Sequence, residues 1–180
     1  MSIITDKKEI ENLREGGRRL ARVLRIVGGE VHPGVRTNTL NSIAERLIRE
    51  VGDEPSFLGY HPPFAQRAFP SAICISVNDE VVHGIPSENP IELQDGDIVG
   101  LDLGVTHKGL ITDSAITVSV GKVSKKIQKL IETTRNSLHA GIKEAQVDNH
   151  LGDIGHAIET CAHEGGFSVV EVLCGHGVGR

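Results

Sequence analysis

Apolar residues recur at helical spacing in two segments near the N-terminus. The first stripe follows a possible Asp6…Glu9 capping box, ends at Gly28-Gly29, and comprises Ile10, Leu13, Gly17, Leu20, Leu24 and Val27. The second starts at Thr37 or Asn38, either of which can cap a helix, and ends at Gly52; it comprises Leu40, Ile43, Ala44, Leu47, Ile48 and Val51. Spacings of three and four residues put each stripe on one face of an α-helix. The sequence therefore predicts two amphipathic helices.

Strand-like runs dominate from about residue 70 to Val120, after a segment (53–70) rich in proline and aromatic residues that we expect to be a loop over the sheet. Two apolar runs flank Lys108-Gly109, which is typical of an antiparallel hairpin. Asp102 and Asp113 lie about equally far from this turn. A symmetric register would therefore place the two carboxylates opposite each other on one face of the sheet.

The second half of the chain repeats the order of elements seen in the first. A helix after Ser124 has a predicted inward stripe of Ile127, Leu130, Ile131, Thr134, Leu138 and Ile142. A second helix has the stripe Leu151, Ile154, Ile158 and Cys161, and is followed by a predicted strand, Phe167 to Leu173, and a His-Gly pair. We interpret residues 1–180 as a single incomplete domain of α/β (α+β) class around an antiparallel sheet. Its first repeat covers about 6–121 and its second about 122–180, with further carboxylates expected beyond the point where the second repeat is cut off.

Asp102 and Asp113 are the strongest candidates for metal chemistry. Both lie inside apolar runs, where a carboxylate needs a partner to be tolerated, and like charges close together need a cation between them. Oxygen ligands of this kind favour Mg, Mn or Fe over a structural zinc. The alternative, solvated aspartates beside turns, suits Asp95 and Asp97 better.

Two of the nine histidines, His83 and His176, each precede a glycine and follow an apolar run. Glycine beside a histidine permits close approach of a ligand or of backbone. The other seven fit loops or exposed helix faces. His107 is the nearest alternative because it lies between the two aspartates, but we expect a hairpin tip to be solvated.

Composition narrows the class of protein. A hydrophobic content of 38% over 180 residues is enough for one globular core, and the net charge of −5 argues against recognition of nucleic acid. The sequence shows neither a signal peptide nor an apolar run of membrane-spanning length. Three cysteines form an odd set without scaffold spacing, which favours a reduced, cytoplasmic setting.

Several ordered motifs resemble those of one family. They are Cys74-Ile-Ser-Val-Asn78 leading to Val81-Val-His-Gly-Ile-Pro86, Asp95-Gly-Asp-Ile-Val99 followed by Asp102 and Asp113, Gly166-Phe-Ser-Val-Val170, and Cys174-Gly-His-Gly-Val-Gly-Arg180. Together they are similar to the N-terminal portion of bacterial type I methionine aminopeptidases, which have the pita-bread fold. The resemblance covers essentially the whole chain.

The resemblance implies roles for individual residues. Asp102 would be a metal ligand, Asp113 a carboxylate bridging two metals, and His176 a catalytic residue that also binds one metal. His83 would be a catalytic histidine that contacts the substrate, and Tyr60, Phe69 and Cys74 would line the methionine pocket. The implied cofactors are two divalent ions, Co, Mn, Fe or Zn.

This sequence departs from the family pattern in three ways. The stretch between Tyr60 and Phe69 is longer than usual, and Val82 stands where a cysteine commonly precedes the substrate histidine. Family members continue to a further histidine and two glutamates, so we expect residues 1–180 alone to be inactive.

The function implied by the resemblance is removal of the initiator methionine from nascent polypeptides. The setting would be the cytoplasm, at the ribosome, with no nucleic-acid or membrane partner and with a monomeric full-length protein. Two alternatives stay open. One is a relative of the Xaa-Pro peptidases and creatinases, which usually carry an additional N-terminal domain. The other is a non-catalytic binding module that keeps the fold.

Overall fold

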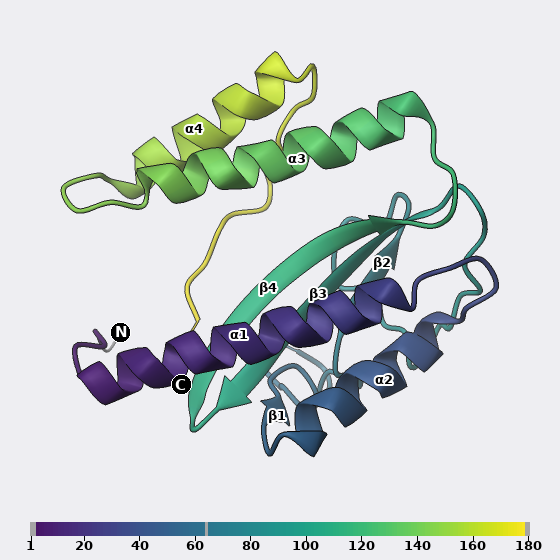
Figure 1. The fold of residues 1–180 in the computed structure, drawn as a ribbon, viewed down its shortest axis with the longest axis horizontal. Helices are drawn as coiled ribbons and strands as arrows, with labels where there is room; N and C mark the ends of the chain where they lie inside the picture. Colours follow the sequence, from purple (N-terminus) through teal and green to yellow (C-terminus); the bar gives the residue numbers. More distant parts are fainter. Residues whose placement is uncertain (1–2, 64, 179–180) are drawn as a thin grey trace. The chain divides into compact units, whose positions relative to one another are not determined.

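The computed structural model describes residues 3–63 and 65–178. These residues divide into two compact units, of which the first runs to Lys122 and the second spans Val123–His176. The first unit contains α1 (Lys7–Gly29), α2 (Thr37–Glu50), β1 (Glu54–Pro55), β2 (Cys74–Val77), β3 (Ile98–His107) and β4 (Leu110–Ser119), and the second contains α3 (Lys125–Glu144) and α4 (Leu151–Glu164) (Figure 1). The internal repeat itself stays a prediction.

The sheet of the first unit is built around β3. Strand β4 pairs antiparallel with one side of β3, and β1 and β2 pair antiparallel with it as well. Side chains alternate along β3, so Val99, Leu101, Leu103 and Val105 point to one face and are buried. Apolar residues of α1 and α2, among them Leu24 and Leu40, join them in a single core. Asp102 alternates with these residues along β3, so its side chain points to the opposite face of the sheet.

The two N-terminal helices form where the apolar periodicity predicted them. The side chain of Asp6 caps α1 by accepting hydrogen bonds from the backbone of Lys8 and Glu9, at 2.8 and 3.0 Å. The cap predicted for α2 is wrong. Arg36 occupies the N-cap position, and the Thr37 hydroxyl instead accepts a hydrogen bond from the Ile91 backbone at 3.0 Å. The Thr37 side chain therefore ties the helix to a distant loop.

The second unit differs from the sequence prediction in two respects. Helix α3 buries Thr133, Ser137 and Gly141, whereas Leu138 and Ile142 are 53% and 58% exposed. Small residues lie inward because α4 packs closely: a methyl group at Gly141 would lie 2.8 Å from the Ile158 side chain.

The strand predicted from Phe167 to Leu173 does not form. A strand is stabilised by a neighbouring ladder, and no described residue pairs with this segment. The segment ends instead in a turn that is closed by a hydrogen bond from the Leu173 N–H to the Val170 carbonyl at 3.1 Å.

None of the helices in residues 3–63 and 65–178 has the length and apolar character needed to cross a membrane.

Candidate active site

The β3–β4 hairpin places Asp102 and Asp113 on the same face of the sheet. The two-residue turn Lys108-Gly109 closes on the pair His107 and Leu110, and from there Asp102 lies opposite Ala115 while Asp113 lies opposite Gly104. The prediction that the two aspartates lie on one face is therefore confirmed, whereas the symmetric register that would place them directly opposite each other is wrong. They are diagonal neighbours, which in antiparallel strands are about 7–8 Å apart.

Cys74 lies on this face as well, because it pairs directly with Asp102 across β2 and β3. Burial raises the pKa of the Cys74 thiol to about 12, and the negative charges of Asp102, Asp113 and Glu80 contribute to the same shift. The thiol is therefore neutral near pH 7. The carboxylates that contribute to this shift are also the kind of ligand that a hard divalent cation prefers.

Asp102 and Asp113 provide two of the ligands that a metal site requires. Within the described residues, no three histidine, cysteine or acidic side chains converge in an arrangement that could hold a metal. The third predicted ligand, His176, lies in the second unit, in an exposed segment without helix or strand. The carboxylate donors fit a metal of the predicted kind, and the role of His176 stays a prediction.

His83 adopts an unusual backbone conformation. Its φ angle is +63°, in the left-handed region that residues with a side chain rarely adopt and that is often found at functional sites. The next residue, Gly84, fixes this turn against β2: its carbonyl accepts a hydrogen bond from Ile75 at 3.1 Å, and its N–H donates to the Ser76 hydroxyl at 3.1 Å. A Cβ at Gly84 would lie 2.1 Å from the Ile75 oxygen. The glycine after the histidine is thus required by close backbone packing.

Two of the three predicted pocket residues, Tyr60 and Phe69, come from the loop between β1 and β2, and the third, Cys74, is the first residue of β2. The rings of Phe57 and Phe69 meet edge to face, with centroids 6.4 Å apart. A Cβ on Gly104 would lie 3.0 Å from the Phe57 ring, so Phe57 covers the aspartate face beside the residue that pairs with Asp113. Tyr60 is 62% exposed. Sequence reasoning missed Phe57, because only the tertiary contact with Gly104 reveals which face it covers.

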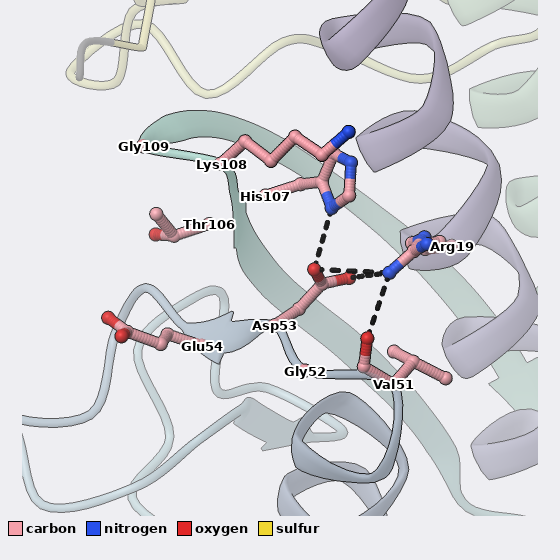
Figure 2. Close-up of a pocket in the computed structure, with 9 residues that line it drawn as sticks. All are labelled: Arg19, Val51, Gly52, Asp53, Glu54, Thr106, His107, Lys108 and Gly109. Atoms are coloured by element: carbon pink, nitrogen blue, oxygen red, sulfur yellow. Dashed lines mark hydrogen bonds and ion pairs between the residues drawn. The ribbon is translucent and has the colours of Figure 1, made fainter.

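His107 is buried, contrary to the prediction for a hairpin tip. It is 4% exposed, and its Nδ1 lies 2.7 Å from an oxygen of Asp53, which is also buried and accepts hydrogen bonds from Arg19 (Figure 2). These residues line a pocket of about 480 Å³ at the turn of the hairpin. The His107 Nε2 atom is buried without a hydrogen-bond partner among the described residues. His107 lies five positions after Asp102 on β3, and side chains alternate along a strand, so His107 points to the opposite face and does not complete the aspartate site.

The comparisons with known proteins agree with this arrangement. The sequence profile described as metallopeptidase family M24 matches residues 11–180. Methionine aminopeptidase of Aquifex aeolicus (strain VF5) is 44% identical over 174 residues, which cover 97% of this chain and 67% of that protein. The crystal structure of methionine aminopeptidase from Rickettsia prowazekii superposes with a TM-score of 0.86 at 35% identity, over 94% of this chain and 65% of that one.

The core of α1 and α2 lies on one face of the sheet, and Asp102 and Asp113 are diagonal neighbours on the other; together with the family match, this identifies the chain as a metallopeptidase of the pita-bread fold. The chain belongs to metallopeptidase family M24 and, within it, to the methionine aminopeptidases. The predicted family, fold and hydrolase class are thereby confirmed. Aminopeptidase P of Escherichia coli, with a TM-score of 0.74 at 18% identity, shares the fold alone. The chain spans about two thirds of the length of the relatives that it matches.

Proposed function

We propose that this chain supplies the metal-binding and substrate-binding residues of an aminopeptidase that removes the N-terminal methionine from new proteins. The observation that carries the proposal is the hairpin register, which puts Asp102 and Asp113 on one face. Cys74 lies on the same face, and the ring of Phe57 covers it. Carboxylates for a metal and apolar groups for a methionine side chain are thus provided side by side.

In this proposal Asp102 and Asp113 would hold two divalent ions, with Asp113 as the ligand that both ions share, and His176 would be a further ligand and a catalytic residue. The ions are Co, Mn, Fe or Zn. Such ions, when bound, activate a water and polarise the scissile carbonyl. The two carboxylates would supply the negative charge that holds such ions at this face of the sheet.

The protein side chains bind and orient the peptide. His83, held by the Gly84 turn, donates or accepts a hydrogen bond at the scissile amide and steadies the substrate as the carbonyl carbon becomes tetrahedral. Tyr60, Phe69 and Cys74 receive the methionine side chain. Because the thiol of Cys74 is neutral, it offers an uncharged and polarizable wall to the thioether.

The proposed partners are the N-termini of nascent polypeptides at the ribosome, and the proposed setting is the cytoplasm, with a monomeric full-length protein. None of the three cysteines forms a disulfide, which supports a reducing compartment.

The test is a chimaera in which residues 1–180 replace the matching part of the Aquifex aeolicus relative. We expect it to release methionine from the peptide Met-Ala-Ser in the presence of Mn²⁺ or Co²⁺. Asp113→Ala should abolish release, because no other group can replace a bridging ligand. Glu159→Ala, which removes an exposed carboxylate on α4, serves as the matched control.

Methionine release that survives Asp113→Ala would contradict the assigned role. A chimaera that folds and binds the peptide without cleaving it would favour the non-catalytic binding module instead.

A further inference from the structure

Backbone hydrogen bonds join the two ends of the stretch between Tyr60 and Phe69, which we call the pocket loop. Gly59 donates a backbone hydrogen bond to the Phe69 carbonyl, and Phe69 donates one to the Tyr60 carbonyl, both at 2.8 Å. Tyr60 is further held by a bond from its N–H to the Phe57 carbonyl at 3.0 Å. The two predicted pocket residues at the ends of the loop are therefore positioned together.

Arg67, which lies on this loop, reaches across to the turn that follows His83. Its two Nη atoms donate in parallel to the two carboxylate oxygens of Glu88. Beside this pair, the Ser87 hydroxyl lies 2.7 Å from the Ser71 hydroxyl and donates to the Pro70 carbonyl at 3.2 Å. The pocket loop and the His83 turn are thus joined at adjacent points.

The Arg67–Glu88 pair differs from ion pairs within a helix. Arg46 and Glu50, for example, are also exposed, but they lie one turn apart on α2 and connect no separate elements. Exposed pairs in general contribute little, whereas two parallel hydrogen bonds to one carboxylate fix the relative orientation of the groups that carry them. The Arg67–Glu88 pair spans 21 positions of the sequence and can therefore orient one loop relative to the other.

We propose that the Arg67–Glu88 pair is a positioning clamp that holds the pocket loop against the His83 turn and thereby sets how tightly the N-terminal methionine is bound. This inference rests on the proposed function for its substrate. Neither side chain takes part in the chemistry, so the clamp acts on substrate binding and leaves the hydrolytic step unchanged.

Tyr60 makes the clamp measurable without any enzymatic activity. The chain contains one tyrosine and no tryptophan, so its intrinsic fluorescence reports on this loop. In the 180-residue chain, Arg67→Ala should increase quenching of Tyr60 by acrylamide and weaken binding of L-methionine about three- to fivefold, as expected for loss of one well-oriented surface pair. Arg46→Ala should change neither. The exchanged variant Arg67→Glu/Glu88→Arg should restore much of the quenching protection, and Arg67→Lys, which cannot form the parallel bonds, should restore less.

In the chimaera, Arg67→Ala should raise KM for Met-Ala-Ser by the same factor and leave kcat within about twofold. The clamp is overturned if Arg67→Ala matches Arg46→Ala in Tyr60 quenching, or if it lowers kcat at constant KM. An unmodified chimaera that releases no methionine would count against the proposed function alone, and the Tyr60 measurement would still decide on the clamp.

Discussion

Arg19→Met is the most informative perturbation of the first unit, because Arg19 compensates a buried carboxylate. Its Nη1 atom donates to both oxygens of Asp53 at 3.2 Å and to the Val51 carbonyl at 3.0 Å (Figure 2). The Asp53 side chain is 3% exposed, and the Arg19 side chain is 30% exposed. Methionine keeps the packing of the arginine stem but removes the charge and all of these hydrogen bonds.

The expected loss follows from the cost of leaving Asp53 without its cation. Removing one partner of a fully buried ion pair costs roughly 3–5 kcal/mol. Arg19 is partly exposed, and His107 still holds Asp53 at 2.7 Å, so we expect Arg19→Met to lower the free energy of unfolding by about 2 kcal/mol. Adding Asp53→Asn removes the uncompensated charge and should restore about half of that loss.

Urea denaturation followed by the fluorescence of Tyr60 measures this change, because Tyr60 lies in the first unit. Arg49→Met breaks the exposed Arg49–Glu45 pair on α2 and should cost less than about 0.5 kcal/mol. Equal losses for Arg19→Met and Arg49→Met would refute the reasoning, as would a double variant less stable than Arg19→Met alone.

Three further predictions concern the aspartate face. Gly84→Ala should displace the His83 turn and reduce methionine release by the chimaera at least tenfold, since a methyl group there would collide with the Ile75 oxygen; activity close to that of the unmodified chimaera would contradict this. Cys74 should react with iodoacetamide far more slowly than the exposed Cys174 at pH 8, as peptide mapping would show, because its thiol is buried with a pKa of about 12. The unfolded thiol ionises near its ordinary pKa, so Cys74 should make stability fall as pH rises from about 9 to 12, and a free energy of unfolding that is constant or rises over that range would be inconsistent with it.

The sequence predicted the elements of the first unit well, because each has a local signal. Apolar residues at helical spacing and closing glycines identified the helices, and Lys108-Gly109 identified the hairpin. The register of that hairpin was harder. Both turn residues have positive φ angles, +50° and +76°, which is typical of a tight two-residue turn and makes His107 and Leu110 the closing pair. Counting from that pair moves Asp113 from opposite Asp102 to a diagonal position.

The remaining errors arise from contacts between residues distant in the sequence. His107 was expected to be solvated because its buried partner Asp53 precedes it by 54 positions and has no local signal. The inward face of α3 was misassigned because the residues that pack against α4 and its C-cap are Gly141 and Thr133. Neither is a large apolar residue, so the apolar periodicity did not identify them. A strand also requires a neighbour, and the apolar run from 167 to 173 has none among the described residues.

The most direct test of the central claim is a titration of Mn²⁺ into the 180-residue chain, followed by calorimetry, with the Asp102→Ala and Asp113→Ala variants beside it. Asp102, Asp113 and His176 are the three ligands that we assign to this chain, so we expect binding that is measurable but much weaker than in the chimaera. Each substitution should abolish it, whereas Glu159→Ala should leave it unchanged. Mn²⁺ binding that survives both aspartate substitutions would show that the face of the hairpin that carries Asp102 and Asp113 is not the metal site.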